Sequence, residues 1–277
     1  ILVSTCVCAI GTVAAKEVTY YVSAAAGEKK DGTEDYPFLT VCEAIEYANS
    51  LNYTENDTVN VMILDAGTVT WGDYNKTNFL KYPYTLNVSA QNSTTELLLN
   101  SDSYVGGKTN FDNLKLNTAS SYFYFCGNDV TFGSNLTSSA NIPWYLGEES
   151  PKTFNNDINV EFDNQLDKLI MCGWWGTTFN CDINITYNHN SSPTFSFGAA
   201  GNQAANYNGN INFNFKNATG VTFKETNTAA KNFGSNAAIQ VINSTGINTI
   251  TADNAGFDSI TNSNIALDAT NLLSQYF

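Results

Sequence analysis

Three aspartates at the start of successive sequence repeats have the residue type and spacing that could do chemistry. Asp129, Asp157 and Asp182 each precede a short phrase of alternating apolar and polar residues. If these phrases are stacked strands in matching register, the carboxylates lie about 5 Å apart. Like charges at that distance must bind a cation, share a proton or point away from each other into solvent.

Two roles follow for such a carboxylate stack. Calcium is the cation that closely spaced carboxylate oxygens favour, so the three aspartates are candidate metal ligands. A carboxylate pair near this spacing could also serve a retaining glycosidase. The other interpretation is that each aspartate caps a turn at the start of a strand and faces solvent.

Adjacent aromatic residues form a second candidate surface. Trp144 and Tyr145 are neighbours in the sequence, as are Trp174 and Trp175. Rings that face outward from a rigid coil can stack on sugars, so these four are candidate glycan-binding residues. Neighbouring strand residues face opposite ways, so at most one of Trp174 and Trp175 is expected in the core if both lie on a strand. The alternative is that the aromatic rings pile into core stacks.

The charged residues restrict the chemistry further. All 12 basic residues are lysines, so the bidentate guanidinium clamp on carboxylates is absent. The single histidine, His189, lies in a polar segment typical of a turn. The net charge of −14 excludes ordinary nucleic-acid binding and disfavours docking to anionic membranes or polyuronates. We therefore assign no catalytic residue from the sequence.

The phrases that follow the aspartates recur at nearly fixed spacing. They begin at residues 129, 157, 182, 210 and 238, so the intervals are 28, 25, 28 and 28 residues. Apolar residues flank a polar one in each phrase, which is the two-residue period of a half-buried strand. A second apolar stretch follows about twelve residues later, at 169–171, 195–197 and 221–223. This pattern predicts an all-β solenoid of short strands, a parallel β-helix.

Polar residues that share a repeat position predict contacts between coils. Asn159, Asn184, Asn212 and Gln240 occupy the same place in their phrases and would form an amide ladder. The simpler interpretation is that they are polar residues on the outer face of the strands.

Glycines and cysteines suggest two further features. Gly147, Gly173 and Gly198 follow the second apolar stretches and would turn the chain with positive φ. Cys172 and Cys181 flank one turn and could form a disulfide in an oxidising compartment. The alternative is that both are buried thiols in the core.

The two ends of the chain differ from the repeats. Residues 1–15 are uncharged, mostly apolar and end in Val13-Ala14-Ala15, which indicates the remnant of a secretory signal peptide. This run is too short to span a membrane. Residues 58–277 are expected to form the coils. Repeat-like sequence continues to the C-terminus, so a truncated solenoid is one interpretation.

Residues 16–57 are expected to form an N-terminal cap region. Thr40 followed by Glu43 matches a capping box, which predicts a helix over about 40–50. Such a helix would cover the open end of the coil, where strand edges otherwise meet water. Its apolar face would consist of Val41, Ala44, Ile45 and Ala48.

The same region resembles a known superfamily. The segment with Tyr20-Tyr21-Val22-Ser23, Asp31-Gly32-Thr33 and Tyr36-Pro37-Phe38 is similar to the start of secreted, right-handed parallel β-helix proteins of the pectate-lyase-like superfamily. The phrases at 111–114 and 128–133 resemble surface proteins of gut Firmicutes. The resemblance implies a right-handed parallel β-helix with a short N-terminal capping helix. It marks fold rather than function, because the superfamily includes lyases, hydrolases, adhesins and non-catalytic surface proteins.

Together these features favour a non-catalytic, secreted or cell-surface β-helix that acts as an adhesin-like or rigid spacer module. The alternatives are a carbohydrate-active enzyme, either a polysaccharide lyase or a glycoside hydrolase, and a glycan-binding module of such an enzyme. The expected partner is a polysaccharide or a host or cell-wall glycan, with calcium as the one candidate cofactor. We expect neither nucleic-acid binding nor membrane insertion of the mature chain.

Overall fold

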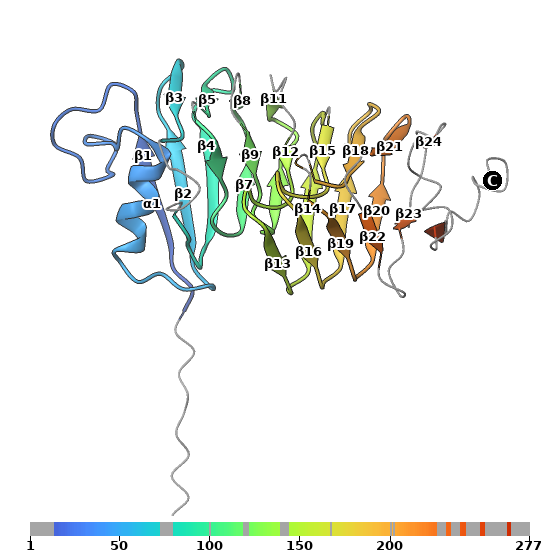
Figure 1. The fold of residues 1–277 in the computed structure, drawn as a ribbon. Helices are drawn as coiled ribbons and strands as arrows, with labels where there is room; N and C mark the ends of the chain where they lie inside the picture. Colours follow the sequence, from blue (N-terminus) through green and yellow to red (C-terminus); the bar gives the residue numbers. More distant parts are fainter. Residues whose placement is uncertain are drawn as a thin grey trace, which may run out of the picture.

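The computed structural model shows a parallel β-helix in which short strands of successive coils lie side by side (Figure 1). One helix and 25 strands occur in the part of the chain that the structure describes. That part comprises residues 14–72, 80–99, 101–118, 122–138, 144–166, 168–199, 201, 203–225, 231–233, 239–241, 250–252 and 265–266.

The longest sheet, sheet A, runs the length of the described solenoid. Every one of its strands pairs in parallel with the next. In spatial order its strands are β1 (Glu17–Val22), β2 (Thr58–Ile63), β4 (Thr85–Ala90), β7 (Thr109–Phe111), β10 (Val130–Phe132), β14 (Ile158–Phe162), β17 (Ile183–Tyr187), β20 (Ile211–Phe215), β23 (Ile239–Val241) and β25 (Ile265–Ala266).

Three further parallel sheets complete the coils. Sheet B contains β3 (Thr68–Thr70), β5 (Glu96–Leu98), β8 (Lys115–Asn117) and β11 (Thr137–Ser138). Sheet C contains β6 (Ser103–Tyr104), β9 (Phe123–Tyr124), β12 (Trp144–Tyr145), β15 (Lys168–Ile170), β18 (Thr194–Phe197), β21 (Val221–Glu225) and β24 (Ile250–Ala252). Sheet D contains β13 (Lys152–Phe154), β16 (Thr177–Phe179), β19 (Ala205–Tyr207) and β22 (Lys231–Phe233).

The cross-section changes part-way along the solenoid. In the described residues before β13, the coils use sheets A, B and C, whereas those after it use sheets A, C and D. The coil from β10 to β13 contributes a strand to all four sheets. This coil therefore joins two segments of different shape.

The strand phrases predicted from the repeats are confirmed, with one change of register. Ile158 pairs with Ile183, and Ile183 with Ile211, as the shared positions require. Val130, however, pairs with Val160 and not with Ile158. This register places the Phe132 and Phe162 rings in a stack 5.1 Å apart. Because those rings are the largest side chains of the two strands, their packing accounts for the shift of two residues.

The N-terminal cap follows the prediction closely. Helix α1 (Val41–Asn49) begins after Thr40, whose side chain accepts a hydrogen bond from the Glu43 backbone N–H. The predicted apolar face is buried, and α1 lies at the end of the stack beside β1 (Figure 1). Sheet A itself starts within the cap region, because all six residues of β1 pair with β2.

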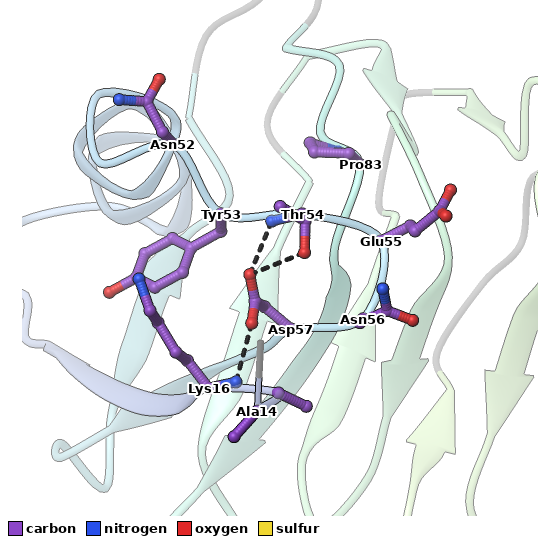
Figure 2. Close-up of a pocket in the computed structure, with 10 residues that line it drawn as sticks. Ala14, Lys16, Asn52, Tyr53, Thr54, Glu55, Asn56, Asp57 and Pro83 are labelled. Atoms are coloured by element: carbon purple, nitrogen blue, oxygen red, sulfur yellow. Dashed lines mark hydrogen bonds between the residues drawn. The ribbon is translucent and has the colours of Figure 1, made fainter. Parts of the chain in front are cut away.

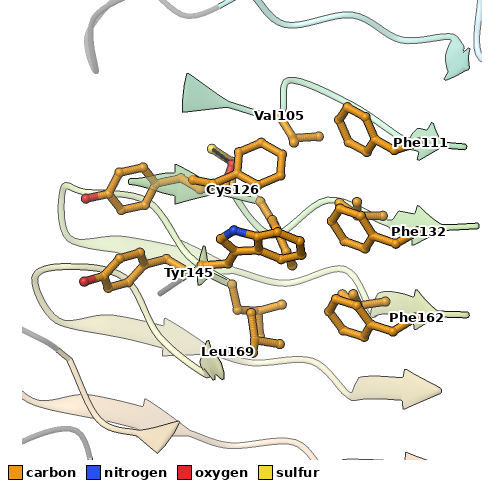
Figure 3. Close-up of a cluster of buried hydrophobic side chains, with 14 of the residues drawn as sticks. Val105, Phe111, Cys126, Phe132, Tyr145, Phe162 and Leu169 are labelled. Atoms are coloured by element: carbon orange, nitrogen blue, oxygen red, sulfur yellow. Dashed lines mark hydrogen bonds between the residues drawn. The ribbon is translucent and has the colours of Figure 1, made fainter. Parts of the chain in front are cut away.

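The interior is filled by stacked aromatic rings (Figure 3). Phe111, Phe132 and Phe162 lie above one another in sheet A, with neighbouring ring centroids 5.6 and 5.1 Å apart. On sheet D, Phe179 stacks between Phe154 and Tyr207, at 5.6 Å from each. Each coil thus buries its apolar side chains against the coils on either side, as a solenoid requires.

Asparagines on the outside form columns of hydrogen bonds between coils, which we call amide columns. The Asn184 side-chain amide donates to the Asn159 carbonyl oxygen at 3.1 Å, and Asn212 donates to Asn184 at 2.8 Å. The predicted ladder is therefore confirmed for these three residues. Gln240 pairs with Asn212 in the backbone register, but its side chain lies outside the described residues.

Further amide columns run parallel to the first. One consists of Asn155, Asn180 and Asn208, with bonds of 3.0 and 2.8 Å. Three others have mixed members. One links Thr178, Asn206 and Asn232, and another links Asp163, Asn188 and Asn217. The third lies near the N-terminus and links Glu17, Asn60, Asn87 and Asn110.

The corner glycines are only partly as predicted. Gly198 has φ of 93°, but Gly147 and Gly173 do not lie in the positive region. These two are small because backbones meet there: a Cβ on Gly173 would lie 2.0 Å from the Glu148 carbonyl oxygen. The four cysteines of the described residues, Cys42, Cys126, Cys172 and Cys181, are buried and form no disulfide. The bridge between Cys172 and Cys181 is therefore not formed, and the core-thiol interpretation holds.

Candidate functional site

Trp144 lies in the core and presents no ring to a ligand. It is only 2% exposed and stacks on Phe132 with a centroid distance of 4.8 Å. It also meets Phe123 edge to face at 5.7 Å. The expectation that Trp144 binds a glycan is therefore wrong, because alternation along β12 turns this ring inward.

Tyr145 faces the opposite side of β12, away from the phenylalanine stack (Figure 3), yet it is also buried. Its ring belongs to an outer stack with Tyr124 at 4.9 Å, and Tyr124 in turn stacks on Tyr104 at 5.0 Å. Tyr122 and Trp174 pack against Tyr145 edge-on and at a tilt. At 1% exposure, Tyr145 cannot offer a free ring face to a sugar, which corrects the second expectation.

Trp174 and Trp175 lie in the segment between β15 and β16 and not on a strand. Trp174 is half-buried, with its ring 4.9 Å from that of Tyr122. Trp175 is 37% exposed and lies against the backbone of Gly201, where a Cβ would approach the indole to 2.4 Å. Of the four predicted glycan-binding residues, Trp175 is the one with a large exposed ring surface.

Two glutamates beside this aromatic cluster were not identified from the sequence. Glu149 accepts a hydrogen bond from the Tyr104 hydroxyl at 3.0 Å, and burial together with this contact raises the pKa of Tyr104. Glu148 is buried, and its burial raises the pKa of its carboxyl group against the opposing effect of Lys152 at 3.7 Å. A buried carboxyl group with a raised pKa is the type of group that can hold or transfer a proton.

Burial of Glu148 results from close contact of two corner segments. The Trp174 backbone N–H donates to the Glu148 carbonyl oxygen at 3.1 Å, and that of Trp175 donates to Glu149 at 3.3 Å. The segment of Gly147 therefore pairs with the segment of Gly173 as a strand would. The equivalent positions of Gly147 and Gly173 in the repeats are consistent with this pairing, but nothing in the local sequence signals that the Glu148 side chain is buried.

The three aspartates act as hydrogen-bond acceptors for the next coil. Because of the shifted register, Asp129 lies beside Asn159 and accepts from its backbone and side-chain N–H groups at 2.7 and 3.1 Å. Asp157 accepts from the Asp182 backbone at 2.9 Å, and Asp182 from the Asn210 backbone at 2.7 Å. The structure does not bring the three carboxylates together, and the described residues contain no group of three or more His, Cys, Asp or Glu side chains that could hold a metal.

A pocket of about 710 Å³ opens at the N-terminal end of the solenoid (Figure 2). Its most buried polar group is Asp57, which accepts from the Lys16 and Thr54 backbone N–H groups, each at 2.7 Å. The Thr54 hydroxyl adds a third bond at 3.0 Å, and these bonds lower the pKa of Asp57. The carboxylate of Asp57 therefore fastens the start of β1 to the segment that precedes β2.

His189 occupies a turn, as the sequence indicates, with Nδ1 at 3.2 Å from the Ser191 hydroxyl.

Comparison of the chain with protein-family models, with curated proteins and with solved structures finds no match. Within the described residues, no helix has the length and apolar character needed to cross a membrane.

Proposed function

We propose that this chain is a non-catalytic, extracellular β-helix that acts as a rigid adhesin-like or spacer module. The observation that carries the proposal is the set of amide columns, which join the outer side chains of one coil to those of the next. A module that holds its shape outside the cell needs stiffness along its axis, and these columns supply it in addition to the core.

The columns stiffen the solenoid because they cross-link positions that are distant in sequence. Asn180 bonds to residues 25 positions before it and 28 positions after it. Each bond contributes roughly 0.5–1.5 kcal/mol of stability, and several columns run side by side. The aromatic stacks also join neighbouring coils inside the solenoid, since Phe132 and Phe179 each contact rings of the coils on both sides.

We infer secretion from the signal-peptide-like sequence of residues 1–15, and membership of a superfamily from the resemblance of the N-terminal segment. We extend the proposal to a secreted or cell-surface protein of the pectate-lyase-like superfamily, related to surface proteins of gut Firmicutes. An acidic, asparagine-rich exterior suits a protein exposed to the extracellular medium.

The proposal is tested by incubating the full chain with a panel of plant and bacterial polysaccharides, with and without calcium. Reducing ends and unsaturated products are then measured, and small-angle scattering records the shape. A stiff rod without turnover is the expected result. Turnover that is abolished by Glu148→Gln, but retained by Asp157→Asn, would overturn the proposal and assign acid–base chemistry to the buried carboxyl group.

Contact with a glycan at Trp175 is a second candidate function, favoured by one observation. The Trp175 ring is supported by the Gly201 backbone and remains exposed. A supported, exposed indole provides a flat apolar surface with little conformational entropy to lose on binding. Loss of glycan-array signal in Trp175→Ala, with the signal kept in Tyr47→Ala, another exposed aromatic position, would support this function.

A further inference from the structure

A regular grid of polar side chains covers three successive coils, where it spans strands of sheet D, the corner after them and strands of sheet A. Between Thr177 and Tyr187, buried and solvent-facing residues alternate without interruption through β16, the corner and β17. Every second residue therefore faces outward across both sheets. The chain bends at Cys181 between the two sheets, but the bend does not break the alternation.

Three successive coils place hydrogen-bonding side chains at all five outward positions. Their registers match along the strands and through the corner bonds. We call these fifteen residues the amide grid: Thr153, Asn155, Asp157, Asn159 and Glu161 in the first row, Thr178, Asn180, Asp182, Asn184 and Thr186 in the second, and Asn206, Asn208, Asn210, Asn212 and Asn214 in the third.

The grid has a defined spacing. Outward residues of one strand lie about 6.7 Å apart, and neighbouring coils lie about 4.8 Å apart. Five positions in three rows therefore extend at most about 27 Å along the chain path and about 10 Å across the coils. The third row consists of asparagine alone, and the other two rows carry three carboxylates among asparagines and threonines, so the surface is mostly neutral.

The bonds within a column do not exhaust the amides. A side-chain amide has two N–H donors and a carbonyl oxygen with two lone pairs. Asn184 uses one donor toward Asn159 and one acceptor site toward Asn212, and Asn180 does the same in its own column. One donor and one acceptor site of each amide remain, and Asn180 and Asn208 are exposed to solvent.

From this arrangement we infer that the amide grid binds a neutral polysaccharide that lies along it. Sugar hydroxyl groups both donate and accept, which matches the amide and hydroxyl side chains of the grid, whereas the carboxylates of Asp157, Asp182 and Glu161 only accept. An apolar partner would leave the amides without partners, which is costly, and a polyanion would meet the carboxylates of Asp157, Asp182 and Glu161. The column bonds already fix the side chains, so binding costs little further entropy.

This inference rests on the proposed function, because it names the ligand class that an adhesin-like module would hold. It also differs from the Trp175 candidate, which uses an indole between β15 and β16. Binding at the two sites would be lost through different substitutions, so one binding experiment with variants of each site distinguishes them.

The experiment is co-sedimentation of the full chain with microcrystalline cellulose, chitin and insoluble mannan, at low salt and in 0.5 M NaCl. We expect salt-insensitive depletion by at least one polymer. Asn184→Ala with Asn212→Ala should weaken that binding about tenfold. The matched control is Asn87→Ala with Asn110→Ala, which also removes two bonds of one amide column but lies outside the grid.

Each outcome decides the inference. Equal weakening in both double variants, or no depletion by any of the three polymers, overturns it. Binding that survives the grid variant but is lost in Trp175→Ala also overturns it and assigns the ligand to the indole. Soluble reducing sugars in the supernatant would refute the non-catalytic function, whereas the comparison of variants would still test the grid.

Discussion

Removal of Asn180 tests whether the amide columns stabilise the solenoid. Asn180 is the middle member of its column and makes two side-chain bonds, to Asn155 at 3.0 Å and from Asn208 at 2.8 Å. Asn155 and Asn208, at the two ends, each make one of these bonds. The three residues are all exposed, so burial of the side chain does not confound the comparison.

The expected magnitudes follow from the number of bonds. At about 0.5–1.5 kcal/mol for each bond, Asn180→Ala should lower the free energy of unfolding by about 1–3 kcal/mol. Asn155→Ala and Asn208→Ala should each lower it by about half as much. Asn180→Asp should lower the free energy of unfolding more than Asn180→Ala at neutral pH, because a carboxylate would then face the Asn155 side-chain oxygen in place of the amide donor.

The assay is urea unfolding of the four variants and the wild type, monitored by circular dichroism and by tryptophan fluorescence. The ratio between the middle and end positions carries the test. Equal effects at all three positions, or no effect at Asn180, would show that the column bonds only replace bonds to water. Two separate transitions in Asn180→Ala would instead show that the column couples the coils on either side.

Four further outcomes follow from the structure. Phe132→Ala should cost about 3–5 kcal/mol in urea unfolding, because its ring stacks within the core; a loss below 1 kcal/mol would contradict the packing. Thr40→Ala should cost about 1 kcal/mol through loss of the α1 N-cap, and Thr40→Ser should restore most of it. The lowered pKa of Asp57 stabilises the fold above about pH 4, the pKa of an unfolded aspartate, and this stabilisation is lost as the pH falls through the lower folded-state pKa. Asp57→Asn should therefore make the free energy of unfolding less dependent on pH in acid. An unchanged pH dependence in this variant would contradict the assignment. Iodide should quench Trp175 but not the buried Trp144, so Trp175→Phe should remove most of the quenchable emission.

The strands could be predicted from the sequence because their signal is local. Ile183-Asn184-Ile185 displays its alternation within three residues, and its counterparts recur at a similar spacing. The helix was equally visible, since Thr40 and Glu43 signal its start. Register was harder: Asp129-Val130 looks like Asp157-Ile158, and the packing of Phe132 on Phe162 determines which residues pair.

The site could be predicted only in part, because exposure depends on the path of the corner segments. Alternation shows that Trp144 and Tyr145 face opposite ways, but it cannot reveal that Tyr122 and Trp174 cover the outward one. Burial of Glu148 depends on a neighbouring corner segment about 25 residues away. Such contacts have no pattern in the sequence, whereas the columns of asparagines do.

The change of cross-section at the coil from β10 to β13 has a consequence for how this protein can lengthen or shorten. A duplicated or deleted coil is tolerated where the coils above and below it have the same outline, because the remaining neighbours still match. Coils that use sheets A, C and D meet this condition among themselves, as do those that use A, B and C. The coil between them has no substitute in either group, so insertions and deletions of whole coils should accumulate on both sides of it and spare the junction itself.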